Sequence, residues 1–384
     1  MKFVFAPDSF KGSLSAVDMT KMMDDVCKRH FPQVQTVLAP VADGGEGTVE
    51  ALVLANGGHV ETVRVTGPDG NLVEAAYGMI DDGQTAVLEM AQASGLPLMR
   101  GKLDPLGAST RGTGEMIMHA LDRGVKHIVI GIGGSATNDG GMGMLAALGA
   151  RFFDKNENLL YGRGQDLYKV QRADFSNLHP RLHTTDMTVI CDVTNPLYGP
   201  NGATAIYGPQ KGVTDALFGA LEGGMVHYSG ILERTLGYSI SQFPGAGAAG
   251  GLGAALGGVL KAHMRKGIDA VLEAMHFDEL LNGCDLVITG EGKLDAQSVL
   301  FGKAPAGIAK RCAVKGIPVI AVVGGMGDGA QAFYQEGLTS IITAINGIMP
   351  LDHAIANAKA LFEDSLERLF RLIKIGMSMH ESGS

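Results

Sequence analysis

The feature that most constrains the fold is an alternation of short apolar strands and amphipathic helices, which occurs at both ends of the chain and stops in the middle. Near the N-terminus, segments 2–6 and 34–38 have the composition of strands, and a helical pattern lies between them. Near the C-terminus, strand-like segments recur at 286–289, 318–323 and 340–345. Alternating strands and helices build a parallel sheet, so the two ends together predict one doubly wound, flavodoxin-like α/β sheet.

The middle of the chain loses this alternation directly after Gly57. Segments 59–66 and 72–80 have the composition of strands, and no helix separates them. The turn sequence at 67–70 joins them and predicts antiparallel pairing. A chain of 384 residues has room for about two domains. We therefore expect a discontinuous domain at 1–62 and 280–384, an inserted mixed α/β domain at 63–279, and an active site in the cleft between them.

Composition argues against several classes of function. The net charge is −9 and no basic run occurs, which disfavours nucleic acid as a partner because its phosphates need a basic face. The four cysteines form no C-x-x-C pair, so neither a zinc site nor a disulfide framework is indicated. The N-terminus lacks a signal-peptide pattern, and only a glycine-rich stretch approaches the length of a membrane span. These features predict a cytoplasmic protein without a membrane partner, and they specify no oligomeric state.

Glycine is the most over-represented residue, with 56 copies, about twice the usual share. One glycine-rich run, 131–143, follows an apolar strand at 127–130 and precedes a helix. A glycine loop between a strand and a helix directs free amides and the helix N-terminus toward an anion. We expect a phosphate cradle here, in a loop outside the core, built from Gly133, Gly134, Ser135, Thr137, Asn138 and Asp139.

The same loop permits another interpretation. Gly131, Gly133 and Ala136 match the dinucleotide pattern G-x-G-x-x-A, and Asp154 stands near the position of a ribose-binding acid. A NAD-dependent dehydrogenase of a small hydroxy acid is therefore an alternative. Two further glycines at 140–141 disfavour it, because each would cost about 1 kcal/mol in the first turns of the helix. The chain contains neither a Walker A motif nor the protein-kinase motifs.

Charged residues stand just beyond the ends of several predicted strands, where open parallel sheets bind their ligands. Each of them alone also fits a helix cap or a solvated loop charge, but their number favours a shared site. They are Asp8, Lys11, Asp43, Glu46, Asp192, Glu291, Lys293 and Asp295.

Four long segments carry a resemblance to a known family. They are APDSFKGSLS at 6–15, PVADGGEGT at 40–48, GGSATNDGGMG at 133–143, and TGEGKLDAQS at 289–298 followed by GKAP at 302–305. In these segments the chain resembles the type 1 glycerate kinase family. The resemblance implies ATP- and Mg²⁺-dependent phosphorylation of D-glycerate at the 2-hydroxyl. It also implies a flavodoxin-like domain and a second, restriction-enzyme-like α/β domain. A non-catalytic sensor of glycerate or nucleotide remains a further alternative.

Phosphoryl transfer needs a phosphate cradle, a metal, a base for the attacking hydroxyl and a cation for the substrate carboxylate. We expect Lys11 and Lys293 to assist the cradle, and Asp192, at a strand end, to act as the base. Lys11 and Asp43 complete the expected catalytic set. Mg²⁺ usually takes one or two protein carboxylates together with phosphates and water, and the candidates are Asp43, Glu291 or Asp295. The residues that we expect to contact the substrate are Arg111, Lys211, Asn195 and Ser298.

Overall fold

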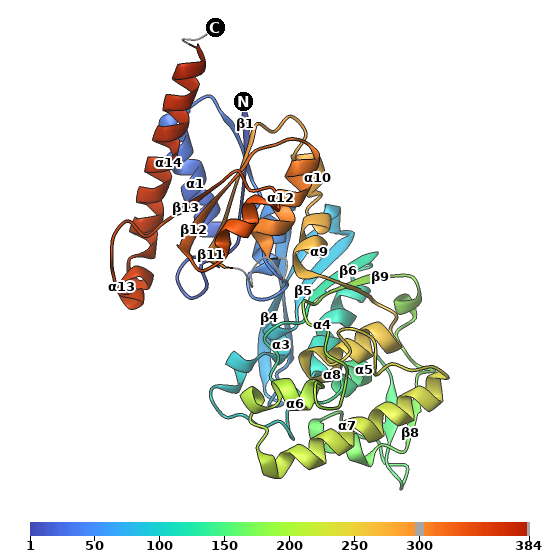
Figure 1. Ribbon diagram of the computed structural model, residues 1–384. Coiled ribbons are helices and arrows are strands. Elements are labelled where there is room, and N and C mark those ends of the chain that lie inside the picture. Colours follow the sequence, from blue (N-terminus) through green and yellow to red (C-terminus); the bar gives the residue numbers. More distant parts are fainter. Residues whose placement is uncertain (296–302, 382–384) are drawn as a thin grey trace. The chain divides into compact units, whose positions relative to one another are not determined.

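The computed structural model describes residues 1–295 and 303–381, and the chain forms two compact units (Figure 1). The terminal unit contains Met1–Asp43, Glu50–Gly57 and Ile268–Ser384. The central unit contains Gly44–Val49 and Gly58–Gly267. These limits differ from the predicted ones at 62–63 and 279–280. Strand β3 (His59–Thr66) belongs to the central unit. Ile268 packs against Gly307 within the terminal unit.

The terminal unit is built on a wholly parallel sheet with the strand order β13-β12-β11-β1-β2. Counted within this unit, the order is 2-1-3-4-5, which is the flavodoxin-like arrangement. The predicted parallel sheet is thus confirmed. Its strands are β1 (Lys2–Pro7), β2 (Gln35–Leu38), β11 (Leu286–Leu294), β12 (Val319–Met326) and β13 (Ser340–Thr343).

Helices cover both faces of this sheet, with α1 (Ala16–His30) and α14 (Ala358–Glu381) on one face and α12 (Ala304–Val314) on the other (Figure 1). Ser15 caps α1 by accepting a hydrogen bond from the Asp18 amide at 3.0 Å, which satisfies one of the free amides of the first turn. Aromatic contacts, such as that of Phe5 with Phe370, join α14 to β1. Apolar side chains of α1 and α14 therefore form one core with the sheet.

The C-terminal helical region is interrupted at Asn357. The structure has a short helix α13 (Leu351–Ala356) before α14. Asn357 separates them with φ −110° and ψ 15°, and its side-chain amide donates to the His353 carbonyl oxygen at 2.8 Å. A short polar side chain that bonds to the preceding turn competes with helix continuation.

The central unit has a mixed sheet with the order β10-β9-β6-β5-β4-β3. The predicted antiparallel pairing of β3 with β4 is confirmed, and β5, β6, β9 and β10 run parallel to one another. The strands are β3 (His59–Thr66), β4 (Leu72–Ile80), β5 (Thr85–Glu89), β6 (His127–Gly131), β9 (Asp186–Ile190) and β10 (His263–Arg265), and a separate antiparallel pair is formed by β7 (Arg151–Phe153) and β8 (Arg172–Asp174).

Helices surround this second sheet and enclose a core of its own, which includes Tyr77, Ile130, Phe152 and Tyr228. Within the described part of the chain, no helix is both long and apolar enough to span a membrane. The remaining helices of the chain are α2 (Thr48–Asn56), α3 (Ala91–Ser94), α4 (Arg111–Asp122), α5 (Met142–Ala147), α6 (Ala203–Tyr207), α7 (Asp215–Leu236), α8 (Ala248–Gly253), α9 (Gly267–Ala274) and α10 (Phe277–Leu280).

Candidate active site

The strand order of the terminal unit reverses between β1 and β11. In sheets of this kind, ligands bind outside the carboxyl ends of the strands at this reversal. Asp8 directly follows β1, and its amide donates to the Gly290 carbonyl oxygen of β11 at 2.9 Å. Glu291 is the next residue of β11. The fold therefore brings two carboxylates to the place where a flavodoxin-like sheet binds its ligand.

Burial and nearby negative charges raise the pKa values of these two carboxyl groups. Burial raises the pKa of Asp8 to about 8, and the negative charges of Glu291 and Asp43 add to this shift. Burial also raises the pKa of Glu291, while the nearby ammonium of Lys303 opposes that shift. Burial and like charges both disfavour the charged form of a carboxyl group. The pair therefore has too little positive charge around it.

The hydrogen bonds of Glu291 also indicate too little positive charge around the pair. Its side chain is 12% exposed, and Lys303 Nζ lies 3.2 Å from Oε1. The other oxygen, Oε2, is buried and has no hydrogen-bond partner among the described residues. A buried charged oxygen without a partner is costly. Glu291 Oε2 is therefore an open coordination position in this unit.

The other predicted residues of the terminal unit lie around this pair. Asp43 is exposed and acts on both carboxyl groups through its charge. Lys11 is exposed, and its charge opposes the pKa shift of Glu291. Lys293 Nζ and Asp295 Oδ2 form an ion pair at 3.2 Å. Ser298 lies outside the described residues.

The structure does not assemble the predicted metal ligands into a three-residue cage. Among residues 1–295 and 303–381, no group of three or more His, Cys, Asp or Glu side chains is placed to hold a metal ion. Asp43, Glu291 and Asp295 thus do not meet as one cluster. A cation here would need ligands from its substrate, as Mg²⁺ commonly has.

The glycine loop of the central unit follows β6, as predicted. Backbone hydrogen bonds join it to the segment that precedes α4. The Leu96 amide donates to the Gly134 carbonyl oxygen at 2.9 Å, and the Ala136 amide donates to the Ser94 carbonyl oxygen at 2.9 Å. Gly134 adopts a left-handed φ of +74°, which glycine tolerates best. Gly133 and Gly134 are exposed, and their amides donate to no acceptor in the described part of the chain.

A buried lysine fixes the shape of this loop. Lys211 is 1% exposed, and its Nζ donates to Ser135 Oγ at 2.7 Å and to the Thr137 carbonyl oxygen at 2.8 Å. Burial lowers the pKa of this ammonium to about 7, and the charge of Asp139 partly offsets the shift. Lys211 therefore contacts the glycine loop itself, a position that the sequence did not indicate.

Asp139 is a structural residue in this arrangement. It is fully buried, and its carboxylate accepts hydrogen bonds from the amide and hydroxyl of Thr110, both at 2.7 Å. It also accepts from the amides of Gly141 at 3.1 Å and Gly143 at 3.3 Å. The expectation that the cradle lies outside the core is therefore wrong for Asp139, because a buried carboxylate with four donors ties the loop to α4 and α5.

Two polar atoms of the loop remain without partners. Thr137 Oγ1 and Asn138 Oδ1 are buried and make no hydrogen bond among the described residues. Asn138 Nδ2 donates to Thr204 Oγ1 at 3.2 Å. Buried polar atoms normally have partners, so these two atoms, together with the free amides of Gly133 and Gly134, mark the loop as incomplete without a ligand.

The remaining predicted residues of the central unit have partners of their own. Asp192 follows β9, is exposed, and accepts a hydrogen bond from the Gly267 amide at 2.6 Å. Asn195 donates to the Asn201 carbonyl oxygen at 2.8 Å and accepts from the Tyr207 hydroxyl at 2.6 Å.

Arg111, at the start of α4, bonds to Glu115 at 3.1 Å and lies 5.0 Å from the centre of the Tyr161 ring. Its side chain is 31% exposed. The guanidinium group is therefore partly engaged and still accessible to a ligand.

Sequence reasoning did not give a role to three residues that the structure places at these sites. Asp8 was noticed only as a charge beyond a strand, although its position after β1 is the same signal that selected Asp192. Lys303 stands in the GKAP segment, but nothing in its spacing links it to Glu291. Thr110 carries no signal, because its contact with Asp139 depends on the fold alone.

Comparison with known proteins identifies the family. The model of the glycerate kinase family matches residues 3–374. The chain belongs to the glycerate kinase family. Glycerate 2-kinase from Escherichia coli (strain K12) is 45% identical over 359 residues, which cover 93% of this chain and 94% of that protein. Glycerate kinase from Bacillus subtilis (strain 168) is 44% identical, with 99% of each chain covered.

A solved structure agrees with this assignment. A crystal structure from Salmonella typhimurium LT2, whose protein carries the provisional name glycerate kinase 2, has a TM-score of 0.89 and 42% identity, and covers 98% of this chain and 99% of its own. The protein is thus a kinase, and a nucleotide is one of its two substrates. Neither the dehydrogenase nor the sensor alternative finds support among these relatives. Helix α5 begins at Met142, after the dinucleotide pattern and not within it.

Proposed function

We propose that this protein transfers the γ-phosphoryl group of ATP to the 2-hydroxyl of D-glycerate and releases 2-phosphoglycerate and ADP. The observation that carries the proposal is the near-full-length similarity to a glycerate 2-kinase. The substrate is a small acid, and we expect the enzyme to act in the cytoplasm, with neither nucleic acid nor membrane as a partner.

The glycine loop is the proposed site for the phosphates of ATP. The amides of Gly133 and Gly134 are free to donate, and positioned amides are a common means of binding phosphate. Lys211 holds Ser135 and Thr137 in place and supplies the positive charge behind the loop. Asn138 and Thr137 complete the cradle with their unpartnered side-chain atoms. Lys11 and Lys293 remain predicted to assist.

The carboxylates of the terminal unit fit a magnesium ion that is bound together with phosphate oxygens. The unpartnered Oε2 of Glu291 and the raised pKa values of Glu291 and Asp8 are what a site short of one cation would show. Glu291 would hold the ion, with Asp43 or Asp8 as a second carboxylate. Bound there, Mg²⁺ would neutralise charge on the transferring phosphoryl group. Asp295 fits less well because it already pairs with Lys293.

Two carboxylates compete for the role of base toward the glycerate hydroxyl. The sequence predicted Asp192, but its carboxylate already accepts the Gly267 amide. Asp8 directly follows β1 and its amide donates to the Gly290 carbonyl oxygen of β11, so its carboxyl group lies at the strand reversal where such sheets bind their ligands. We favour Asp8 for this role and retain Asp192 as the alternative. Arg111 is the proposed partner of the substrate carboxylate, and Asn195 and Ser298 remain predictions.

A direct assay tests the proposed function. The protein is incubated with ATP, Mg²⁺ and D-glycerate, and the products are identified by ³¹P NMR. We expect 2-phosphoglycerate, no turnover in EDTA, and poor turnover of L-glycerate, because a positioned hydroxyl depends on its stereocentre. A 3-phosphoglycerate product would correct the regiochemistry. Reduction of NAD⁺ by glycerate, without phosphorylation, would refute the proposal.

A further inference from the structure

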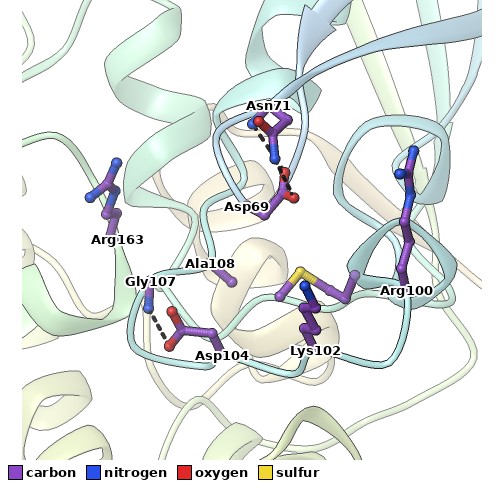
Figure 2. A pocket seen from close by; sticks show the side chains of 9 residues that line it. Asp69, Asn71, Arg100, Lys102, Asp104, Gly107, Ala108 and Arg163 are labelled. Atoms are coloured by element: carbon purple, nitrogen blue, oxygen red, sulfur yellow. Dashed lines mark hydrogen bonds between the residues drawn. The ribbon is translucent and has the colours of Figure 1, made fainter.

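The central unit contains a pocket apart from the glycine loop and the carboxylate pair, beside Tyr161, whose ring both Arg111 and Arg163 contact. Its volume is about 460 Å³, and it lies among the turn between β3 and β4, the segment that follows α3, and the residue that precedes a 3₁₀ turn at Gly164–Lys169 (Figure 2). Cavities of this size accommodate small molecules. None of its lining residues belongs to the glycine loop or to the carboxylate pair. The lining residues are Asp69, Asn71, Met99, Arg100, Lys102, Asp104, Gly107, Ala108 and Arg163.

Three cations surround this pocket without carboxylate partners. Arg100 and Arg163 lie on opposite sides, with Lys102 between them (Figure 2). Within the described residues, none of the three has a carboxylate oxygen within the 4.0 Å of an ion pair. Arg163 instead lies 4.7 Å from the centre of the Tyr161 ring. The net charge of the chain is −9, so a group of unpaired cations runs against the overall charge.

The two acidic residues of the pocket are occupied by their own turns. Asp69 accepts from the Asn71 amide at 3.0 Å and from the Asn71 side chain at 2.7 Å. Asp104 Oδ1 accepts from the Gly107 amide at 2.9 Å (Figure 2). These carboxylates shape the backbone, and neither forms an ion pair within 4.0 Å of the cations, although the charge of Arg100 contributes to the lowered pKa of Asp69. Carboxylate oxygens accept more than one hydrogen bond, so both can still accept from a ligand hydroxyl.

We propose that this pocket is a second anion site, and that its ligand is a small hydroxylated phosphate ester. Arginine and lysine together suit phosphate, because the guanidinium group binds it with two parallel hydrogen bonds and the ammonium group supplies a point charge. The pocket is larger than inorganic phosphate needs, and its few apolar side chains, Met99 and Ala108, leave little area for an apolar group. Asp69 and Asp104 accept hydrogen bonds from the hydroxyl groups of the ester.

Binding of glycerol 3-phosphate, measured by isothermal titration calorimetry without nucleotide, tests this site. The full-length wild-type chain should bind it. The triple variant Arg100→Ala/Lys102→Ala/Arg163→Ala should bind about tenfold more weakly or worse, since each charged hydrogen bond is worth more than a tenfold change. The matched control is Lys126→Ala, which removes an exposed lysine beyond the other end of α4 and should leave binding unchanged.

Three results would overturn the proposal: no binding by the wild type, unchanged binding by the triple variant, or inorganic phosphate bound as tightly as the ester. Loss of binding in Lys211→Met would also overturn it, by placing the probe at the glycine loop. If the triple variant melts at a lower temperature, Lys102→Ala alone decides, because this exposed side chain makes no ion pair. The kinase assay is a separate readout, since probe binding without glycerate phosphorylation would refute only the proposed function.

Discussion

In the central unit a buried cation, Lys211, donates to oxygen acceptors, whereas in the terminal unit two carboxylates, Asp8 and Glu291, are only partly balanced by the ammonium groups of Lys303 and Lys11. Burial favours the neutral forms in both regions, because it lowers the pKa of Lys211 and raises the pKa values of Asp8 and Glu291. The cradle keeps its shape through protein hydrogen bonds, while the carboxylate pair still lacks a positive charge. We therefore propose ligand binding for the first region, and metal and proton chemistry for the second.

The largest expected effect separates the two candidate bases. Asp8→Asn should lower kcat by ~10²–10⁴-fold, the usual cost of losing a general base. Asp192→Asn should stay within a few-fold of wild type, because asparagine still accepts the Gly267 amide. Steady-state kinetics with saturating ATP measures both variants. The reverse result would move the chemistry to Asp192 and break the comparison.

The next effect concerns folding and not turnover. Asp139→Ala removes a buried acceptor of four hydrogen bonds and should lower the free energy of unfolding by ~3 kcal/mol or more. Asp154→Ala is the matched control, because Asp154 also accepts several bonds from its own turn but is only half-buried. Urea titrations compare the two. Equal stability of both variants would mean that burial of Asp139 does not hold the loop.

Lys211→Met tests whether the cradle binds ATP. The variant keeps the volume of the side chain and loses its two hydrogen bonds and its charge. We expect KM for ATP to rise roughly 10- to 100-fold, the cost of one or two charged hydrogen bonds, with a smaller change in kcat. Lys126→Met serves as the control. An unchanged KM would show that the loop does not contact the nucleotide.

Glu291→Gln tests the missing cation. Glutamine keeps the shape of the side chain and loses the charge, so the Mg²⁺ concentration for half-maximal activity should rise several-fold, roughly to tenfold, as expected for one of few carboxylate ligands. Glu336→Gln, which breaks the surface ion pair with Lys310, should leave the Mg²⁺ titration unchanged. A shift in both variants, or in neither, would remove Glu291 from the metal site.

A further effect is in the pH dependence of stability, where the two regions should act in opposite directions. Asp8 holds its proton more tightly in the folded state, so stability should fall as pH rises from 3.8 to about 8. Lys211 holds its proton less tightly when folded, so stability should rise between about 7 and 10.5. Melting temperatures are measured as a function of pH. Asp8→Asn should lose the fall in stability toward pH 8, and Lys211→Met should lose the rise above pH 7. Parallel profiles for both variants and wild type would contradict the assigned causes.

Sequence patterns predicted the parallel terminal sheet, the β3–β4 pair and β6, because a strand beside a helix or a turn leaves a local signal. They did not predict β5 or the short strands β7, β8 and β10. The glycine loop was also visible as a dense run between a strand and a helix. The burial of Asp139 and Lys211 was not visible, because the partners of each are distant in sequence: Thr110 for Asp139, Ser135 and Thr137 for Lys211. A loop residue looks solvated in one dimension even when other segments cover it.

The strand order of the terminal sheet has a consequence during synthesis of the chain. The middle strand, β11, lies between β1 and β12, but the ribosome makes it about 250 residues after β2. At a translation rate of ~5–20 residues per second, the edge of β1 waits roughly 10–50 s for its neighbour. The central unit is complete before that time, because its last residue is Gly267. The N-terminal strands therefore leave the ribosome first and complete their sheet last, and their apolar faces need protection from aggregation throughout that interval.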